Sequence, residues 1–356
     1  MSAGPEQTPV DLAALRRRHA SLEAYAGTRL VTLDDGAGRG VRVIEMRSGA
    51  GLEAEIVVDR SFDIGRLARD GETVSWHTPA GDRHPALIDP HAEDGQGYLR
   101  GFSGFLSTCG FDHIRQPETE SARDMPLHPT PDIHYPLHGL GAHQPARLIG
   151  HGLSETGDRP HLWCEGEVVQ AMNFRGALRL RRRIEMSLGG ADLRIRDRVE
   201  NIGPHPAPSM MLYHFNLGYP LVDTDSRLEF DPSEPLWQSA EHDPRSAFGP
   251  PLDSYRSEIS VHRPASPGIA TCRLVNPARG LELGISFDTA TLPCLQLLRL
   301  RGAGYYMAGI EPCTTVHRSR GEARAAGELP VLMPGERRDF ALDISLTRNT
   351  TTSAKE

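Results

Sequence analysis

Residues 209–220 (SMMLYHFNLGYP) place a side chain that can carry a proton in the pattern of a strand leaving a protein core. The stretch begins as an apolar run and ends in Gly and Pro. Side chains alternate in an extended backbone, so Met210, Leu212, His214 and Asn216 share one face. On that face two apolar residues are followed by an imidazole and an amide. This order predicts a core strand that opens into a polar site, although a half-buried histidine bonded to a backbone carbonyl would have the same sequence.

A carboxylate and a second imidazole occur in similar contexts elsewhere in the chain. Glu311 ends an alternating stretch in which Met307 and Gly309 share its face. Partial burial at that position would raise the pKa of the carboxyl group toward the range of a general base. His138 lies in the sequence PLHG at 136–139. If the fold brings them together, Glu311, His138 and His214 can act as a set of general acids and bases.

Composition bounds the kinds of protein that this chain can be. It has 356 residues, 38% of them hydrophobic and 24% charged, with a formal net charge of -8. These values are typical of a soluble globular protein, and the mild acidity without long basic segments predicts no nucleic-acid partner. No apolar run reaches the roughly 18 residues of a membrane span, and no signal peptide is visible, so we expect no membrane contact. Five scattered cysteines without a CxxC pattern indicate reduced thiols and a cytoplasmic location.

The distribution of periodic segments predicts an all-β fold. Residues 9–24 can form one short N-terminal helix with Thr8 as its cap and Pro9 at its first position. After residue 28 the pattern changes to short alternating segments separated by Gly and Pro, of which the chain has 36 and 28. The clearest strands are expected at residues 41–46, 52–58, 178–188, 193–199, 281–287, 295–300 and 340–346. The first two should form a hairpin, and Gly189-Gly190 marks a turn between the next two.

One large sandwich of long antiparallel sheets fits these segments best. We expect a lead-in and helix over residues 1–27, a single domain over 28–347 and a disordered tail over 348–356. Residues 76–136 are poor in strand pattern and rich in Gly, His and Pro, as is typical of long loops that carry function on a β scaffold. Nothing in the sequence separates a monomer from a homodimer.

Several motifs resemble those of a known superfamily, and they occur in the same order along the chain. LHG at 137–139, HFNLGYP at 214–220 and GIEP at 309–312 are similar to motifs of the galactose mutarotases, or aldose 1-epimerases. VDRSFDIG (58–65), GFLSTCGFDHIRQP (104–117) and the longer stretch at 199–221 resemble more closely an uncharacterised bacterial branch, DUF4432. The resemblance covers about residues 28–346. It implies a galactose mutarotase-like β-supersandwich that binds a small carbohydrate.

The resemblance also implies a role for each matching residue. Glu311 would be the base that takes the proton of the anomeric hydroxyl, His214 the acid that protonates the ring oxygen, and His138 a stabiliser of that oxygen. The implied sugar-binding residues are Arg60, Asp63, Asp112, His113 and Asn216. Mutarotases of this kind need no cofactor. Arg60 together with Arg115 would suit an acidic sugar, on charge alone.

Two other functions stay open at this point. The family's later Asp-His-x-Phe motif is missing, and additional histidines lie near His138. A divalent metal could be held by His134, His138, His214 and Glu311, which would fit a metal-dependent keto-sugar isomerase, epimerase or lyase on the same scaffold. A sugar-binding protein without catalysis is the second alternative, although binding alone seldom needs a matched acid and base.

Overall fold

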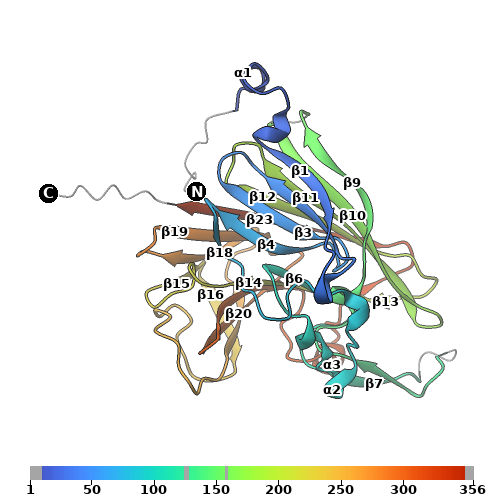
Figure 1. The fold of residues 1–356 in the computed structure, drawn as a ribbon. Helices are drawn as coiled ribbons and strands as arrows, with labels where there is room; N and C mark the ends of the chain where they lie inside the picture. The colour runs from blue at the N-terminus through green and yellow to red at the C-terminus, as the bar shows by residue number, and fades with distance from the viewer. Residues whose placement is uncertain (1–9, 124–127, 157–158, 349–356) are drawn as a thin grey trace.

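The computed structural model describes residues 10–123, 128–156 and 159–348, and these residues are mostly β-strand. Three large antiparallel sheets and two small ones make up the fold (Figure 1). The all-β sandwich expected from the sequence is confirmed. Within the described part of the chain, no helix has the length and apolarity that a membrane span requires.

The sheets are as follows, each given in spatial order. The five-stranded sheet consists of β1 (Gly27–Thr32), β2 (Arg42–Arg47), β3 (Leu52–Val57), β4 (Asp63–Arg69) and β5 (Glu72–Thr73). The eight-stranded sheet consists of β15 (Arg227–Phe230), β18 (Ile269–Asn276), β19 (Leu281–Asp288), β23 (Arg337–Arg348), β12 (Asp192–Asn201), β11 (Gly176–Ser187), β10 (His161–Met172) and β9 (Arg147–Ser154). The six-stranded sheet consists of β16 (Ser233–Gln238), β17 (Glu258–Pro264), β20 (Cys294–Gly302), β21 (Tyr305–Cys313), β14 (Met210–Leu217) and β6 (Leu106–Phe111).

The remaining elements are short. Two-stranded sheets are formed by β13 (Ala207–Pro208) with β22 (Val331–Leu332), and by β7 (Glu118–Ser121) with β8 (Asp132–Tyr135). The α-helices are α1 (Leu12–Arg16), α2 (Ala92–Gly95) and α3 (Arg320–Ala325). Single 3-10 turns are η1 (Leu22–Ala24), η2 (Gly36–Gly38), η3 (Pro85–Leu87), η4 (Gly97–Arg100) and η5 (Gly141–His143).

The N-terminal helix is shorter than the sequence pattern predicts. Asp11 caps it by accepting a hydrogen bond from the Ala14 amide at 3.0 Å. The helix ends at Arg16 with Arg17 as its C-cap, and only a separate 3-10 turn follows at Leu22–Ala24, so the predicted continuous helix to residue 24 is wrong. Thr8, Pro9 and residues 349–356 lie outside the described residues, and β23 extends through Arg348, which we expected in the tail.

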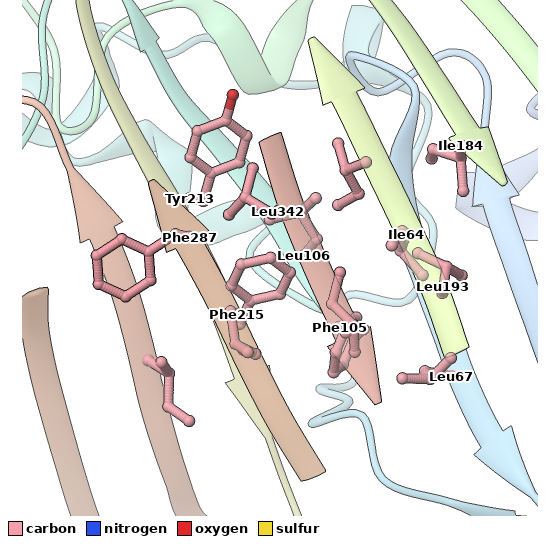
Figure 2. Packing of buried hydrophobic residues seen from close by; sticks show 14 of the residues in the cluster. Ile64, Leu67, Phe105, Leu106, Ile184, Leu193, Tyr213, Phe215, Phe287 and Leu342 are labelled. Atoms are coloured by element: carbon pink, nitrogen blue, oxygen red, sulfur yellow. The ribbon is translucent and has the colours of Figure 1, made fainter. Parts of the chain in front are cut away.

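The main core lies between the three large sheets and is continuous. Figure 2 shows Leu106 and Phe215 of the six-stranded sheet near Leu342 of the eight-stranded sheet, with Ile64 and Leu67 of β4 in the same cluster. Every residue of β14 is buried. Alternation divides them, because Met211, Tyr213, Phe215 and Leu217 belong to this core whereas Met210 and Leu212 do not.

A second, smaller core covers the opposite face of the six-stranded sheet. There the side chains of Cys109, Met210, Leu212, Cys294 and Cys313 pack against loop residues. Those residues include Tyr98, Ile114, Leu137 and, less deeply buried, Phe102, and Trp237 of β16 packs against the same cluster. The loops expected to carry function therefore cover one face of this sheet, and His214 lies on that face.

Candidate active site

Strand register brings Glu311 and His214 together from distant parts of the sequence. In the β14–β21 pair, Leu212 is opposite Cys313 and Phe215 is opposite Ile310, so His214 faces Glu311. On the other side of β21, Gln296 of β20 is the partner of Glu311. Ser107 of β6 is the partner of His214. Directly opposite side chains share a face and lie close enough to interact, so these four residues form a polar row across the sheet.

The row contains one direct contact between the candidate acid and base. His214 Nε2 lies 3.4 Å from Glu311 Oε1, with 6% and 0% of the two side chains exposed. Glu311 Oε2 accepts a hydrogen bond from Gln296 Nε2 at 2.5 Å. Neither Glu311 Oε1 nor His214 Nδ1 has a hydrogen-bond partner among the described residues. Buried polar atoms without partners are costly, and here they leave hydrogen-bonding capacity for a ligand.

Burial sets the protonation of this pair. The pKa of Glu311 is raised to about 8, chiefly by loss of solvation and also by the neighbouring Cys313, while the Gln296 hydrogen bond and the Arg115 charge oppose the rise. Loss of solvation lowers the pKa of His214 to about 4. Between these values the pair holds one proton, and that proton rests on Glu311. Both groups are thereby poised for proton exchange near neutral pH.

His138 is held beside this pair in an uncommon backbone conformation. Its φ is 60°, in the left-handed region that side chains rarely adopt. The Arg115 amide donates to His138 Nδ1 at 3.3 Å, which leaves the proton of the neutral ring on Nε2. The ring meets His214 edge-on, with centroids 5.6 Å apart. Burial and the neighbouring His214 hold the pKa of His138 well below its ordinary value, so it is a neutral donor.

Aromatic side chains from the covering loops enclose the two imidazoles. The Phe102 ring lies 5.0 Å from His214, and the Tyr98 ring lies 5.0 Å from His138. Tyr98 donates its hydroxyl proton to Ser107 Oγ at 2.8 Å, which anchors the loop to the row. Phe102 and His138 are half-buried, whereas Tyr98 and His214 are buried.

The chain matches one family model over most of its length. That model is the domain of unknown function DUF4432, matched over residues 38–346. The chain belongs to the DUF4432 family. A search of curated protein sequences found no match to it.

Solved structures place this DUF4432 chain in the galactose mutarotase-like fold. A candidate aldose 1-epimerase from Klebsiella pneumoniae superimposes with a TM-score of 0.79 at 20% identity, covering 91% of this chain and 84% of that one. A galactose mutarotase-like protein from Clostridium acetobutylicum superimposes with a TM-score of 0.62 at 14% identity, covering 90% of this chain and 98% of that one. Galactose 1-epimerase from Lactobacillus acidophilus NCFM superimposes with a TM-score of 0.56 at 13% identity, covering 90% of this chain and 99% of that one. At these identities the likeness shows the fold.

Arg60 and Asn216, two of the sugar-binding candidates of the DUF4432 chain, meet at Gly104. Asn216 donates from Nδ2 to the Gly104 carbonyl at 3.1 Å, and its buried Oδ1 has no partner among the described residues. A Cβ on Gly104 would lie 2.8 Å from Arg60 Nη2, so only glycine allows this close approach. Arg60 Nη1 lies 3.4 Å from Asp82, while Nε and Nη2 have no hydrogen-bond partner in the described chain.

The other three sugar-binding candidates have protein partners instead. Asp63 is fully buried, accepts from the Thr108 amide at 2.9 Å and pairs with Arg182 at 2.9 Å. Asp112 accepts from Gln170 at 2.7 Å and pairs with Arg175 at 2.9 Å. His113 Nε2 lies 2.8 Å from the Gln116 carbonyl oxygen. These bonds place the three residues in the protein's own polar contacts, while His113 Nδ1 has no partner among the described residues, and a part in sugar binding stays a prediction.

The four residues considered for a metal do not meet as a group. His134 is exposed on β8, where its Nδ1 lies 2.9 Å from Thr119 Oγ1. Across the described ranges, no cluster of three or more His, Cys, Asp or Glu side chains is arranged to hold a metal ion.

Sequence reasoning missed Gln296, Tyr98 and Phe102. Gln296 is the one amide among the leucines of β20, and this is only a weak sequence signal that the strand has a polar position facing the site. The two aromatic residues lie in a loop whose path depends on tertiary contacts.

Proposed function

We propose that this protein is an isomerase of the aldose 1-epimerase type, which interconverts the anomers of a sugar by acid/base ring opening. The observation that carries the proposal is the buried contact of His214 with Glu311 at 3.4 Å, with His138 edge-on to His214. The mutarotase-like fold supports it, because several structures that share the fold are described as aldose or galactose 1-epimerases.

The reaction begins with a proton shift inside the pair. Transfer from Glu311 to His214 gives a carboxylate and an imidazolium. Glu311 then takes the proton of the anomeric hydroxyl, the bond between the first carbon and the ring oxygen breaks, and His214 protonates that oxygen. His138 donates a hydrogen bond from Nε2 to the same oxygen as negative charge develops. Rotation about the first carbon–carbon bond and the reverse steps close the ring on the other face of the aldehyde.

Neighbouring residues supply sugar contacts in this proposal. Asn216 Oδ1 can accept a hydrogen bond from a sugar hydroxyl, and Arg60 Nη2 can donate one to a sugar oxygen. Phe102 and Trp76, whose rings lie 5.3 Å apart, offer apolar surface for the C–H face of a pyranose. Arg115 is not among these contacts, because its guanidinium nitrogens bind protein atoms. The expectation of an acidic sugar then rests on Arg60 alone and stays a prediction.

Replacement of Glu311 by Gln tests the proposal. We expect wild-type protein to accelerate anomer exchange in a panel of aldoses and uronic acids followed by NMR. Glu311→Gln should lower the rate by at least about a hundredfold, since it removes the general base. Glu282→Gln, which alters a surface carboxylate 3.6 Å from Arg273, is the matched control and should keep the rate.

Elemental analysis of untagged protein accompanies this assay. Metal-free protein that exchanges anomers and loses this with Glu311→Gln supports the proposal. Stoichiometric metal without exchange of any sugar would contradict it and would favour the metal-dependent isomerase or lyase.

A further inference from the structure

Arg115 is a buried cation that takes no part in the proton transfers proposed above. It follows β6, has a left-handed φ of 69° and is 6% exposed. Its Nη2 donates to the Thr315 carbonyl at 3.1 Å and contacts Cys313 Sγ at 3.4 Å, while Nη1 donates to the His317 carbonyl. These bonds tie the guanidinium to the segment that follows β21. A residue committed in this way can orient neighbours with little freedom of its own.

The remaining nitrogen of the guanidinium determines how Gln296 faces Glu311. Arg115 Nε donates to Gln296 Oε1 at 2.9 Å. Because Oε1 is taken, the amide nitrogen is the end that faces Glu311, and it donates to Oε2 at 2.5 Å. The other carboxyl oxygen, Glu311 Oε1, therefore faces His214 Nε2. Without Arg115 the Gln296 amide could turn over and present an oxygen to the carboxyl group.

The backbone of Arg115 holds the other half of the site. Its N–H donates to His138 Nδ1 at 3.3 Å, and its carbonyl accepts from the His138 amide at 2.8 Å. The first bond selects the ring tautomer that carries its proton on Nε2, and the second fixes the turn in which His138 lies. One residue thus contacts His138 directly and Glu311 through a single amide.

We propose that Arg115 is a positioning residue that aligns Glu311 and His138 for proton transfer. This inference rests on the proposed acid/base function of the site. Arg115 is to act through Gln296 on Glu311 and through its own backbone on His138, without touching the sugar. Its side chain should therefore affect the rate of the chemical step more than sugar binding.

The charges around Glu311 set the expected effect of removing the side chain. The groups around this carboxyl group are His214 from β14, Gln296 from β20, Cys313 from its own strand β21, and Cys109 from β6, which lies beyond β14. The Arg115 charge and the Gln296 bond lower the pKa of Glu311, against burial and Cys313. Loss of Arg115 should raise that pKa. Each unit of increase lowers the share of the productive ionised carboxylate about tenfold.

The test compares Arg115→Met and Arg115→Lys with Arg318→Met. The guanidinium carbon of Arg318 lies 5.1 Å from the centroid of the Trp237 ring, and that of Arg115 lies 5.9 Å from it. Arg318 is a matched control because it is exposed and has no bond to Gln296. Arg115→Met should lower kcat on the order of tenfold to a hundredfold with little change in KM. Arg115→Lys keeps the charge and loses the bond to Gln296, so its effect should be smaller. Arg318→Met should match the wild type.

A second readout does not depend on activity. Glutamate labelled with carbon-13 at the side-chain carboxyl allows the titration of Glu311 to be followed by NMR, with Glu311→Gln assigning the signal. The titration of Glu311 should move to higher pH in Arg115→Met, and by a smaller amount in Arg115→Lys. If the Met variant does not fold, the Lys variant provides the comparison with the wild type. Folded Arg115 variants with unchanged titration and kcat would overturn the inference. If the wild type exchanges no sugar while the titration shifts, the positioning role stands and the proposed function falls.

Discussion

At the scale of single residues, Glu311 and His214 behave as one titrating unit. The pKa of Glu311 is raised to about 8 and that of His214 is lowered to about 4, both chiefly by burial. The ordinary order of a carboxyl and an imidazole is therefore reversed, and between pH 4 and 8 the pair carries one proton. Transfer of this proton between the partners does not change the number bound, so the productive fraction is independent of pH in that window.

The shared proton leads to a defined pH profile. We expect kcat/KM for anomer exchange to be level between about pH 4 and pH 8. It should fall above about pH 8, where Glu311 loses the shared proton, and below about pH 4, where His214 gains a second one. Initial rates corrected for spontaneous exchange would measure this, with circular dichroism to verify folding at each pH. A rate that rises through pH 8 would contradict the shared proton, because it would mean that ionised Glu311 alone limits the reaction.

At the scale of elements, β21 must present Glu311 without crowding it. A Cβ on Gly309 would lie 2.6 Å from Glu311 Oε1 and 2.9 Å from Leu298 Cβ. Gly309→Ala should therefore displace the carboxyl group, lower kcat by about tenfold or more, and cost roughly 1–3 kcal/mol of stability through overpacking. Gly302→Ala in the same hairpin, whose Cβ would meet Tyr305 Cβ at 3.5 Å, is the control for assay and melting. A Gly309→Ala variant with wild-type kcat would show that Glu311 tolerates the shift.

Alternation along single strands could be predicted from the sequence, whereas pairing between distant strands could not. The faces of β14 and β21 follow from the order of polar and apolar residues, and the hairpin of β2 and β3 follows from its turn. That His214 meets Glu311 depends on the register of two strands far apart in the chain, for which no local signal exists. The motif likeness indicated the meeting. It did not distinguish Asp63, whose carboxylate binds Thr108 and Arg182 within the protein, from Asn216, whose Oδ1 has no hydrogen-bond partner among the described residues.

At the scale of the whole molecule, one buried ionic cluster joins the three large sheets. Arg182 of β11 pairs with Asp63 of β4 at 2.9 Å and with Asp197 of β12 at 2.6 Å. Thr108 of β6 donates to Asp63, and Tyr213 of β14 donates to Asp197 at 2.8 Å. The sheet that carries the site is thus held to the other two by polar bonds within the apolar core. Buried charges of this kind are tolerated only when each has its partners.

Removal of one member of this cluster should therefore change stability and leave sugar affinity unchanged. Asp63→Ala leaves Arg182 one carboxylate short, and we expect the free energy of unfolding in urea to fall by roughly 3–5 kcal/mol. KM of the folded fraction should stay near the wild-type value, because Asp63 is fully buried and its ion pair with Arg60 is a long one, 4.0 Å to Nε, which leaves Arg60 Nη2 unaffected. Glu53→Ala removes a pair with Arg66 at 3.2 Å whose carboxylate is 40% exposed, and should cost less than about 1 kcal/mol. A raised KM in Asp63→Ala with unchanged stability would return Asp63 to the sugar-binding residues.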